Sequence, residues 1–131
     1  MLVLIDIEWV MKQEDEQELT QISAIRVDER WDKTSEFHVT ICPTDPESAD
    51  WKHIAYHGYS KEQFLQSPDV YASLAEFADW LRGDDVICSW HISAGNTLKN
   101  VWKREFGKEP EQKQISTNTY INEQFSGKQT S

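Results

Sequence analysis

Residues 2–10, LVLIDIEWV, constrain the fold more than any other segment of the chain. The segment is rich in large apolar and β-branched residues, which is typical of a buried β-strand. Side chains alternate between the two faces of a strand, so Asp6 and Glu8 point to the same side. Two like charges side by side are costly to bury without a cation. One face of this strand therefore needs solvent or a divalent ion beside its two acids.

Two further strands are expected soon after the first. The segments 19–27 and 36–42 show the β-branched and alternating pattern of strands, and the polar residues 12–18 are expected to form the turn before them. Because the connections are short and polar, these three strands predict an antiparallel meander.

Beyond residue 45 the apolar spacing changes to the helical period. Ser60 and Gln63 have the spacing of a capping box, Pro68 is expected at the first position of a longer helix, and Gly83 is expected to end it. A later apolar run is typical of a buried strand parallel to the first one. The expected helices cover residues 45–58, 60–66, 68–83 and 93–106, and the expected strand covers 86–90.

These elements predict a single α/β domain with a mixed sheet and flanking helices. The antiparallel strands form one part of the sheet, and the strand over 86–90 joins it in parallel. A length of 131 residues is typical of one domain. We expect the domain in residues 1–110, and a short edge strand followed by a polar tail in residues 111–131.

The chain is acidic, and its charge is unevenly distributed. It has 13 basic and 23 acidic residues, a net charge of −10, which argues against a protein that coats nucleic acid without specificity. Residues 1–90 carry a net charge of −12, and residues 91–131 carry +2. No Asp follows Asp85, and no His follows His91.

The sequence also indicates a cellular location for the protein. It has no apolar run of about 18 residues, so no membrane-spanning segment is expected. Its beginning lacks the basic residue and the length of a signal peptide. Cys42 and Cys88 are expected to be thiols in a reducing compartment. We therefore expect a cytoplasmic protein without a membrane partner.

Asp6 and Glu8 are the candidate catalytic pair. Two carboxylates on one face of a strand can share a divalent ion, and hydrolysis of a phosphodiester by two metal ions uses such a pair. The other interpretation is structural, with Asp6 capping a neighbouring turn and Glu8 in solvent at a strand end. The residues alone leave both interpretations open.

Several segments, taken together, resemble the DEDD 3′–5′ exonuclease superfamily, which is named for four acids. The resemblance implies a ribonuclease H-like fold and metal-dependent hydrolysis of nucleic acid from a 3′ end. Asp6 and Glu8 match its first two acids, which implies catalytic and metal-binding roles with Mg²⁺ or Mn²⁺. The segments, in the order found in the family within residues 1–107, are LVLIDIEWV, ELTQISAIRVDE, FHVTICP, IAYHGYSKEQFLQSPDVYASLAEFADWL and VICSW.

The match to the family is incomplete at the third and fourth acids. Family members carry the third acid after a Ser-Trp pair, and that position is Ala94 here. The fourth acid and the general base come from a later helix, which this sequence does not reach, so no general base is assigned. The resemblance thus implies weak or absent activity, in a truncated gene product or a degenerate relative. Ala94 favours degeneracy, because truncation alone would not remove the third acid.

Two hypotheses of function follow. The first is a metal-dependent exonuclease acting on single-stranded nucleic acid, with Trp9 stacking on a base. The second is a catalytically dead module that binds protein or nucleic acid, or forms a homodimer that covers an open part of the sheet. Trp90 and Trp102 are expected in the core. The basic residues from Lys99 onward are either a phosphate-binding surface or a solvated helix face.

Overall fold

The computed structural model describes residues 1–13, 16–54 and 59–118. Its centre is a five-stranded sheet with the strand order β3-β2-β1-β4-β5. The first three strands are antiparallel, and β4 pairs in parallel with both β1 and β5. The predicted mixed α/β sheet is therefore confirmed. The strands are β1 (Leu2–Gln13), β2 (Glu16–Val27), β3 (Lys33–Thr40), β4 (Val86–Ser89) and β5 (Lys113–Ser116).

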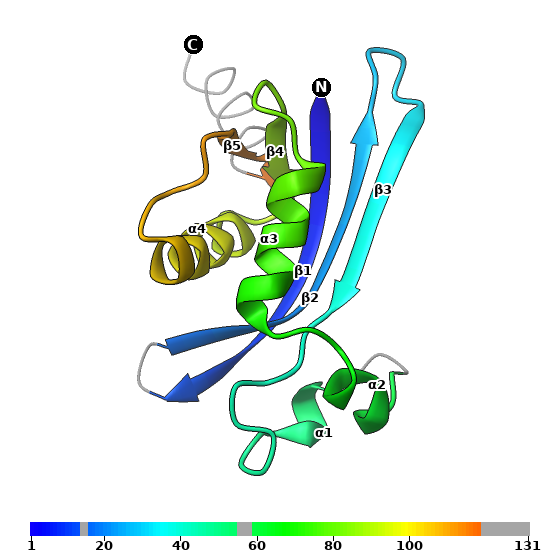
Figure 1. Ribbon diagram of the computed structural model, residues 1–131. Helices are drawn as coiled ribbons and strands as arrows, with labels where there is room; N and C mark the ends of the chain where they lie inside the picture. Colours follow the sequence, from blue (N-terminus) through cyan, green and yellow to red (C-terminus); the bar gives the residue numbers. More distant parts are fainter. Residues whose placement is uncertain (14–15, 55–58, 119–131) are drawn as a thin grey trace.

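Two longer helices cover one face of the sheet. They are α3 (Val70–Trp80) and α4 (Ile92–Phe106), and Figure 1 shows both on the same side of β1. The short helices α1 (Trp51–Ile54) and α2 (Lys61–Leu65) lie beyond the end of β3. Within the described part of the chain, no helix is long and apolar enough to cross a membrane.

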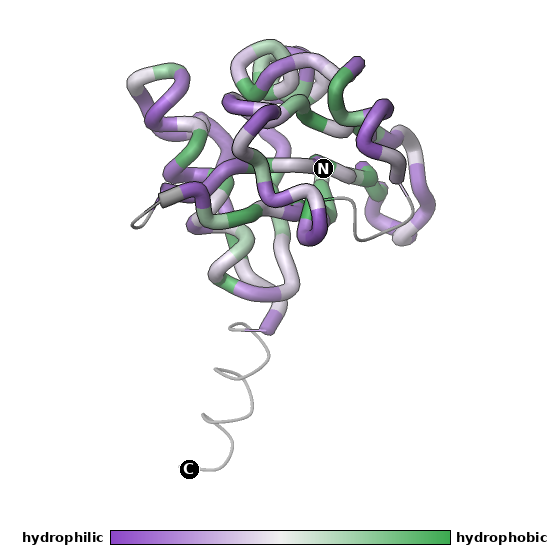
Figure 2. The backbone as a smooth tube through the Cα atoms, turned by 90° about the horizontal axis from the view of Figure 1, so that it is seen from below, coloured by the Kyte–Doolittle hydropathy of each residue, from purple (hydrophilic) through white to green (hydrophobic). Residues whose placement is uncertain are grey.

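The core lies between the sheet and α3 and α4. Val3, Ile5 and Ile7 of β1 are buried on this side, whereas Asp6 between them is exposed. This alternation is the expected period of a strand with one covered face. Figure 2 shows hydrophobic and hydrophilic segments interspersed along the backbone tube. The two helices contribute five core residues, Leu74, Phe77, Leu98, Val101 and Trp102, and Leu81, which directly follows α3, is a sixth.

Of the three predicted signals at helix ends, the capping box is confirmed, whereas neither Pro68 nor Gly83 marks an end of α3, which covers Val70–Trp80 with Leu81 as its C-cap. The Ser60 hydroxyl accepts a hydrogen bond from the Gln63 backbone, and the Gln63 side chain accepts one from the Ser60 backbone, so the capping box is confirmed. Gly107 ends α4 with φ 75°, the left-handed conformation that glycine adopts without strain. Pro68 is not the first helical residue, because Asp69 caps α3 by accepting from the Ala72 backbone.

The predicted turn over residues 12–18 is wrong. The strands β1 and β2 continue into this polar stretch, with Met11 opposite Gln17 and Gln13 opposite Glu16. Backbone pairing between adjacent strands does not require apolar side chains, so polarity alone was a poor guide to the end of the strand. Two other elements differ from their predicted bounds. The strand β3 starts three residues earlier than expected, and α1 occupies four residues of the helix expected over 45–58. Of that expected helix, residues 55–58 lie outside the described residues.

A buried ion pair joins β2 to the start of β4. The Arg26 guanidinium donates to the Asp85 carboxylate at 2.8 Å and to the Trp80 carbonyl at 2.7 Å. Both charged side chains are almost fully buried, at 3% and 0% exposure. The guanidinium also lies 4.1 Å from the centre of the Trp80 ring, and Asp85 accepts a further bond from the Arg82 backbone. One contact set thus holds together β2, the end of α3 and the turn before β4.

We expect Arg26→Ala to destabilise the protein by about 3–5 kcal/mol, because it leaves the buried Asp85 carboxylate with only the Met1 ammonium, 3.4 Å away, as a charged partner. Chemical denaturation measures the change in the free energy of unfolding. As a control, Lys33→Ala removes the exposed ion pair with Glu36 and should change stability by no more than about 1 kcal/mol. Equal effects of the two substitutions would contradict this account.

The ion pair between Arg26 and Asp85 also predicts that the stability of the protein depends on pH. Burial alone would raise the pKa of Asp85, but hydrogen bonds from Arg26 and the Arg82 backbone outweigh it and hold the pKa below its usual range. The stabilisation from Asp85 is therefore present above the unfolded pKa, about 3.9, and is lost as the pH falls through the lower folded pKa. Chemical denaturation at a series of pH values should show that the difference in free energy of unfolding between wild type and Asp85→Asn becomes smaller as the pH falls through this range. A gap independent of pH would contradict the assignment.

Candidate active site

Asp6 and Glu8 lie on the face of β1 opposite the core. Asp6 is exposed and stands across from Ser23 of β2, while Glu8 is half-buried and stands across from Gln21. Among the described residues, no hydrogen bond or ion pair reaches the Asp6 carboxylate, which therefore caps no turn there. This carboxylate is available to an external cation.

A β-bulge follows Glu8 directly. Glu8 is opposite Gln21 and Trp9 is opposite Leu19, so Thr20 is the extra residue of β2. Bulges re-aim side chains and occur often next to active sites. Trp9 is half-buried here and packs against the core cluster.

Beside the bulge lies an open cavity of about 470 Å³. Its wall includes Glu8 and Trp9 from β1, Gln21 from β2, and Asp50 and His53 from the start of α1. This volume lies in the range of small-molecule sites, about 300–1,000 Å³. The cavity brings one predicted acid and the predicted stacking residue together with two residues that the sequence analysis did not select.

Asp50 and His53 form a hydrogen-bonded pair at this cavity. The Asp50 Oδ2 atom lies 2.6 Å from His53 Nδ1, and both side chains are more than half exposed. The hydrogen bond with His53 is the main cause that holds the pKa of Asp50 below its usual range. The spacing Asp-x-x-His within the expected helix over residues 45–58 was the available sequence signal, because residues three apart on a helix are neighbours.

A second histidine, His38, shares the sheet face with Asp6. Ser23 stands between them in the strand register, opposite Asp6 on one side and His38 on the other. The Ser23 hydroxyl lies 2.7 Å from His38 Nδ1, and the Tyr59 hydroxyl lies 3.2 Å from Nε2. The rings of His38 and Tyr59 also stack, with centroids 5.8 Å apart. Both ring nitrogens of His38 are thus already hydrogen-bonded.

The position expected for the third acid holds no charge. Ala94 is in the first turn of α4, half-buried, and packs against the core. Within the described ranges, no group of three or more His, Cys, Asp and Glu side chains could hold a metal ion. The donors that are present, two carboxylates on one strand face, suit Mg²⁺ or Mn²⁺, since Mg²⁺ is commonly held by one or two carboxylates together with waters and substrate phosphates. The residues therefore fit a weakly held ion rather than a closed metal cage.

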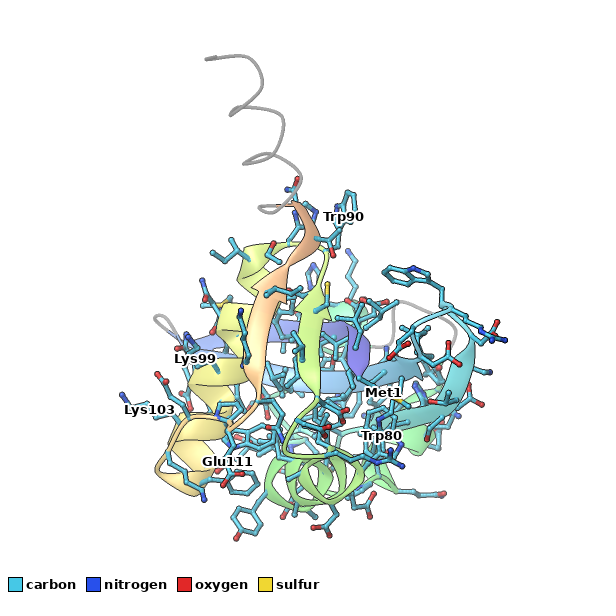
Figure 3. All side chains as sticks on the ribbon, turned by 90° about the horizontal axis from the view of Figure 1, so that it is seen from above. Met1, Trp80, Trp90, Lys99, Lys103 and Glu111 are labelled. Carbon is cyan, nitrogen blue, oxygen red and sulfur yellow. The ribbon has the colours of Figure 1, made fainter. Side chains whose placement is uncertain are left out.

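The remaining sequence candidates have mixed outcomes. Trp102 is buried as expected, whereas the expectation of a core position for Trp90 is wrong, because β4 ends at Ser89 and Trp90 is 58% exposed. Lys99 and Lys103 lie on the side of the molecule opposite β3 (Figure 3).

The fold matches that of a known class of nucleases. A family model described as Exonuclease matches residues 3–128, so the chain belongs to this exonuclease family. It is a member of the DEDD-type exonuclease superfamily. None of the curated proteins compared with the chain matches it.

Solved structures show the same fold at low sequence identity. The ExoI/SSB-Ct complex is 12% identical, with a TM-score of 0.74 over 95% of this chain and 30% of that one. E. coli exonuclease I bound to a dT13 oligonucleotide is 13% identical, with a TM-score of 0.69 over 88% and 27%. The nuclease domain of 3′hExo, a DEDDh family member bound to rAMP, is 12% identical, with a TM-score of 0.67 over 82% and 60%. The chain therefore spans less than two thirds of each of these solved chains.

Proposed function

We propose that this protein is a metal-dependent 3′–5′ exonuclease of low turnover that acts on single-stranded nucleic acid. The observation that carries the proposal is the Asp6–Glu8 pair on the open face of β1, beside a cavity in a chain of the exonuclease family. The structural neighbours bound to dT13 and to rAMP support a nucleic-acid substrate. Low turnover is supported by the uncharged Ala94 at the third-acid position.

Each residue has a defined part in the proposed reaction. Asp6 and Glu8 would hold Mg²⁺ or Mn²⁺, which when bound supplies positive charge to the phosphate that is attacked. Trp9, at the cavity wall, would stack on the terminal base and orient it. With two of four acids present, the ion is held weakly and the transition state is less stabilised. A cytoplasmic location is part of the proposal and is supported by two free cysteines, Cys42 and Cys88.

The activity test uses single-stranded DNA and RNA oligonucleotides labelled at the 5′ end, with millimolar Mn²⁺. We expect slow shortening from the 3′ end that stops when EDTA removes the metal. Asp6→Asn should lower the rate about 100-fold, which is ~2.7 kcal/mol at ~1.4 kcal/mol per tenfold change. Gel electrophoresis of the labelled products measures the rate.

A matched control removes a charge elsewhere. Asp79 is an exposed acid on α3, and Asp79→Asn should leave the rate unchanged. Turnover no higher than in a protein-free blank, from a protein with an intact circular dichroism spectrum, would overturn the proposed activity.

A second candidate function is association without catalysis, either with another copy or with a partner protein. It is favoured by an apolar row on the face opposite α3 and α4. Leu4 is opposite Ile25 of β2 and Cys88 of β4, and Cys88 is in turn opposite Ile115 of β5. Leu4 and Ile25 are half-buried, and Ile115 is 37% exposed. An apolar row across four strands is a surface that a second chain could cover.

If a homodimer covers this row, sedimentation velocity should show a dimer, and Ile25→Lys should convert it to a monomer, because it places a charged ammonium within the apolar row, where burial is costly. Ile92 is 58% exposed at the start of α4, so Ile92→Lys is a control that should leave the dimer intact. A wild-type monomer at all protein concentrations would exclude the homodimer.

A further inference from the structure

His53 lines the candidate cavity, and none of the described residues is hydrogen-bonded to its Nε2 atom. His53 and Glu8 line the same cavity, one from α1 and the other from β1. Asp50 engages His53 Nδ1 at 2.6 Å, and no described residue is hydrogen-bonded to Nε2. A carboxylate on one nitrogen of an imidazole fixes the tautomer in which the other nitrogen is a proton acceptor. The pair therefore has the arrangement of an oriented base at the edge of a cavity.

The other histidine near the acids is a poorer base. His38 lies in the same row as Asp6, but Ser23 and Tyr59 occupy both of its ring nitrogens. A water molecule would have to displace one of these hydroxyl groups before His38 could take a proton from it. His53 needs no such displacement, because its ring is 71% exposed and its Nε2 has no partner among the described residues.

We propose that His53, oriented by Asp50, is the general base of the exonuclease reaction; this inference rests on the proposed function above. His53 Nε2 removes a proton from water while the water oxygen forms a bond to the terminal phosphorus. The bond between that phosphorus and the 3′ oxygen of the preceding nucleotide breaks. The leaving oxygen takes a proton from solvent, so the products are a nucleoside 5′-monophosphate and a shortened strand with a 3′ hydroxyl.

Asp50 is a positioning residue in this scheme, since it acts through the imidazole. Asp50→Asn keeps the size of the side chain but removes the charge that favours the proton on His53 Nδ1. We therefore expect Asp50→Asn to lower kcat with little change in KM. A purely structural role of Asp50 at the start of α1 would instead raise KM or lower the melting temperature.

The test compares histidine variants of the full chain on a labelled single-stranded oligonucleotide with Mn²⁺. General-base catalysis contributes about 10²–10⁴-fold, so His53→Ala should lower kcat at least about 100-fold. Added imidazole should restore part of the rate, because a free base can occupy the vacated space in an open cavity. His91→Ala is the matched control, since His91 lies at the start of α4 and should keep the wild-type rate. Melting curves of all variants check folding.

The outcomes separate this inference from the proposed function. Loss of rate in His53→Ala with imidazole rescue supports both. Wild-type turnover that is lost in Asp6→Asn but kept in His53→Ala overturns the role of His53 and leaves the exonuclease activity standing. Loss and rescue in His38→Ala instead of His53→Ala also overturns it. Absence of wild-type turnover overturns the activity and the base together.

Discussion

The buried pair of Arg26 and Asp85 is the contact on which the shape of the sheet depends. β4 joins β1 after a long crossover through three helices, so its position requires a fixed point near its start. Asp85 lies one residue before β4. Its carboxylate is bound by the guanidinium of Arg26, which belongs to β2, the middle strand of the antiparallel part. Because removing one partner leaves the other charge buried, replacing either residue alone is expected to destabilise the fold. It therefore fixes how the parallel and the antiparallel parts of the sheet meet.

The strand β1 contributes residues both to the core and to the candidate site. Its odd-numbered residues, from Val3 to Ile7, fill the core, and its even-numbered residues Asp6 and Glu8 face the other way. Trp9 continues the odd-numbered series and packs against the core cluster, and the bulge residue Thr20 lies beside it in the wall of the cavity. The site is thus a product of strand periodicity together with one irregularity.

Much of the fold could be predicted from the sequence, because period and capping are local properties. The alternation over β1, the capping box at Ser60 and the glycine end of α4 were all readable from neighbouring residues. The length of the β1–β2 hairpin was not, since strand pairing there is a backbone interaction that polar side chains do not reveal. The exposure of Trp90 also depended on where β4 ends.

In the candidate site, too, some features could be predicted from the sequence and others could not. The shared face of Asp6 and Glu8 follows from counting residues along one strand. The approach of Asp50 and His53 to Glu8 joins segments more than 40 residues apart, and the bulge that shapes the cavity is a register shift between two strands. Neither has a local signature strong enough to read in a single sequence.

The exposed position of Asp6 has a consequence for how such a protein changes over time. An exposed residue without partners among the described residues can be replaced at little thermodynamic cost, so folding alone exerts no pressure to keep an acid there. Arg26 is in the opposite situation, since any replacement is penalised whether or not the protein has a substrate. In a lineage that lost its chemistry, Asp6 would drift while Arg26 stayed. The presence of both in one chain makes position 6 the more sensitive record of whether the chemistry is still in use.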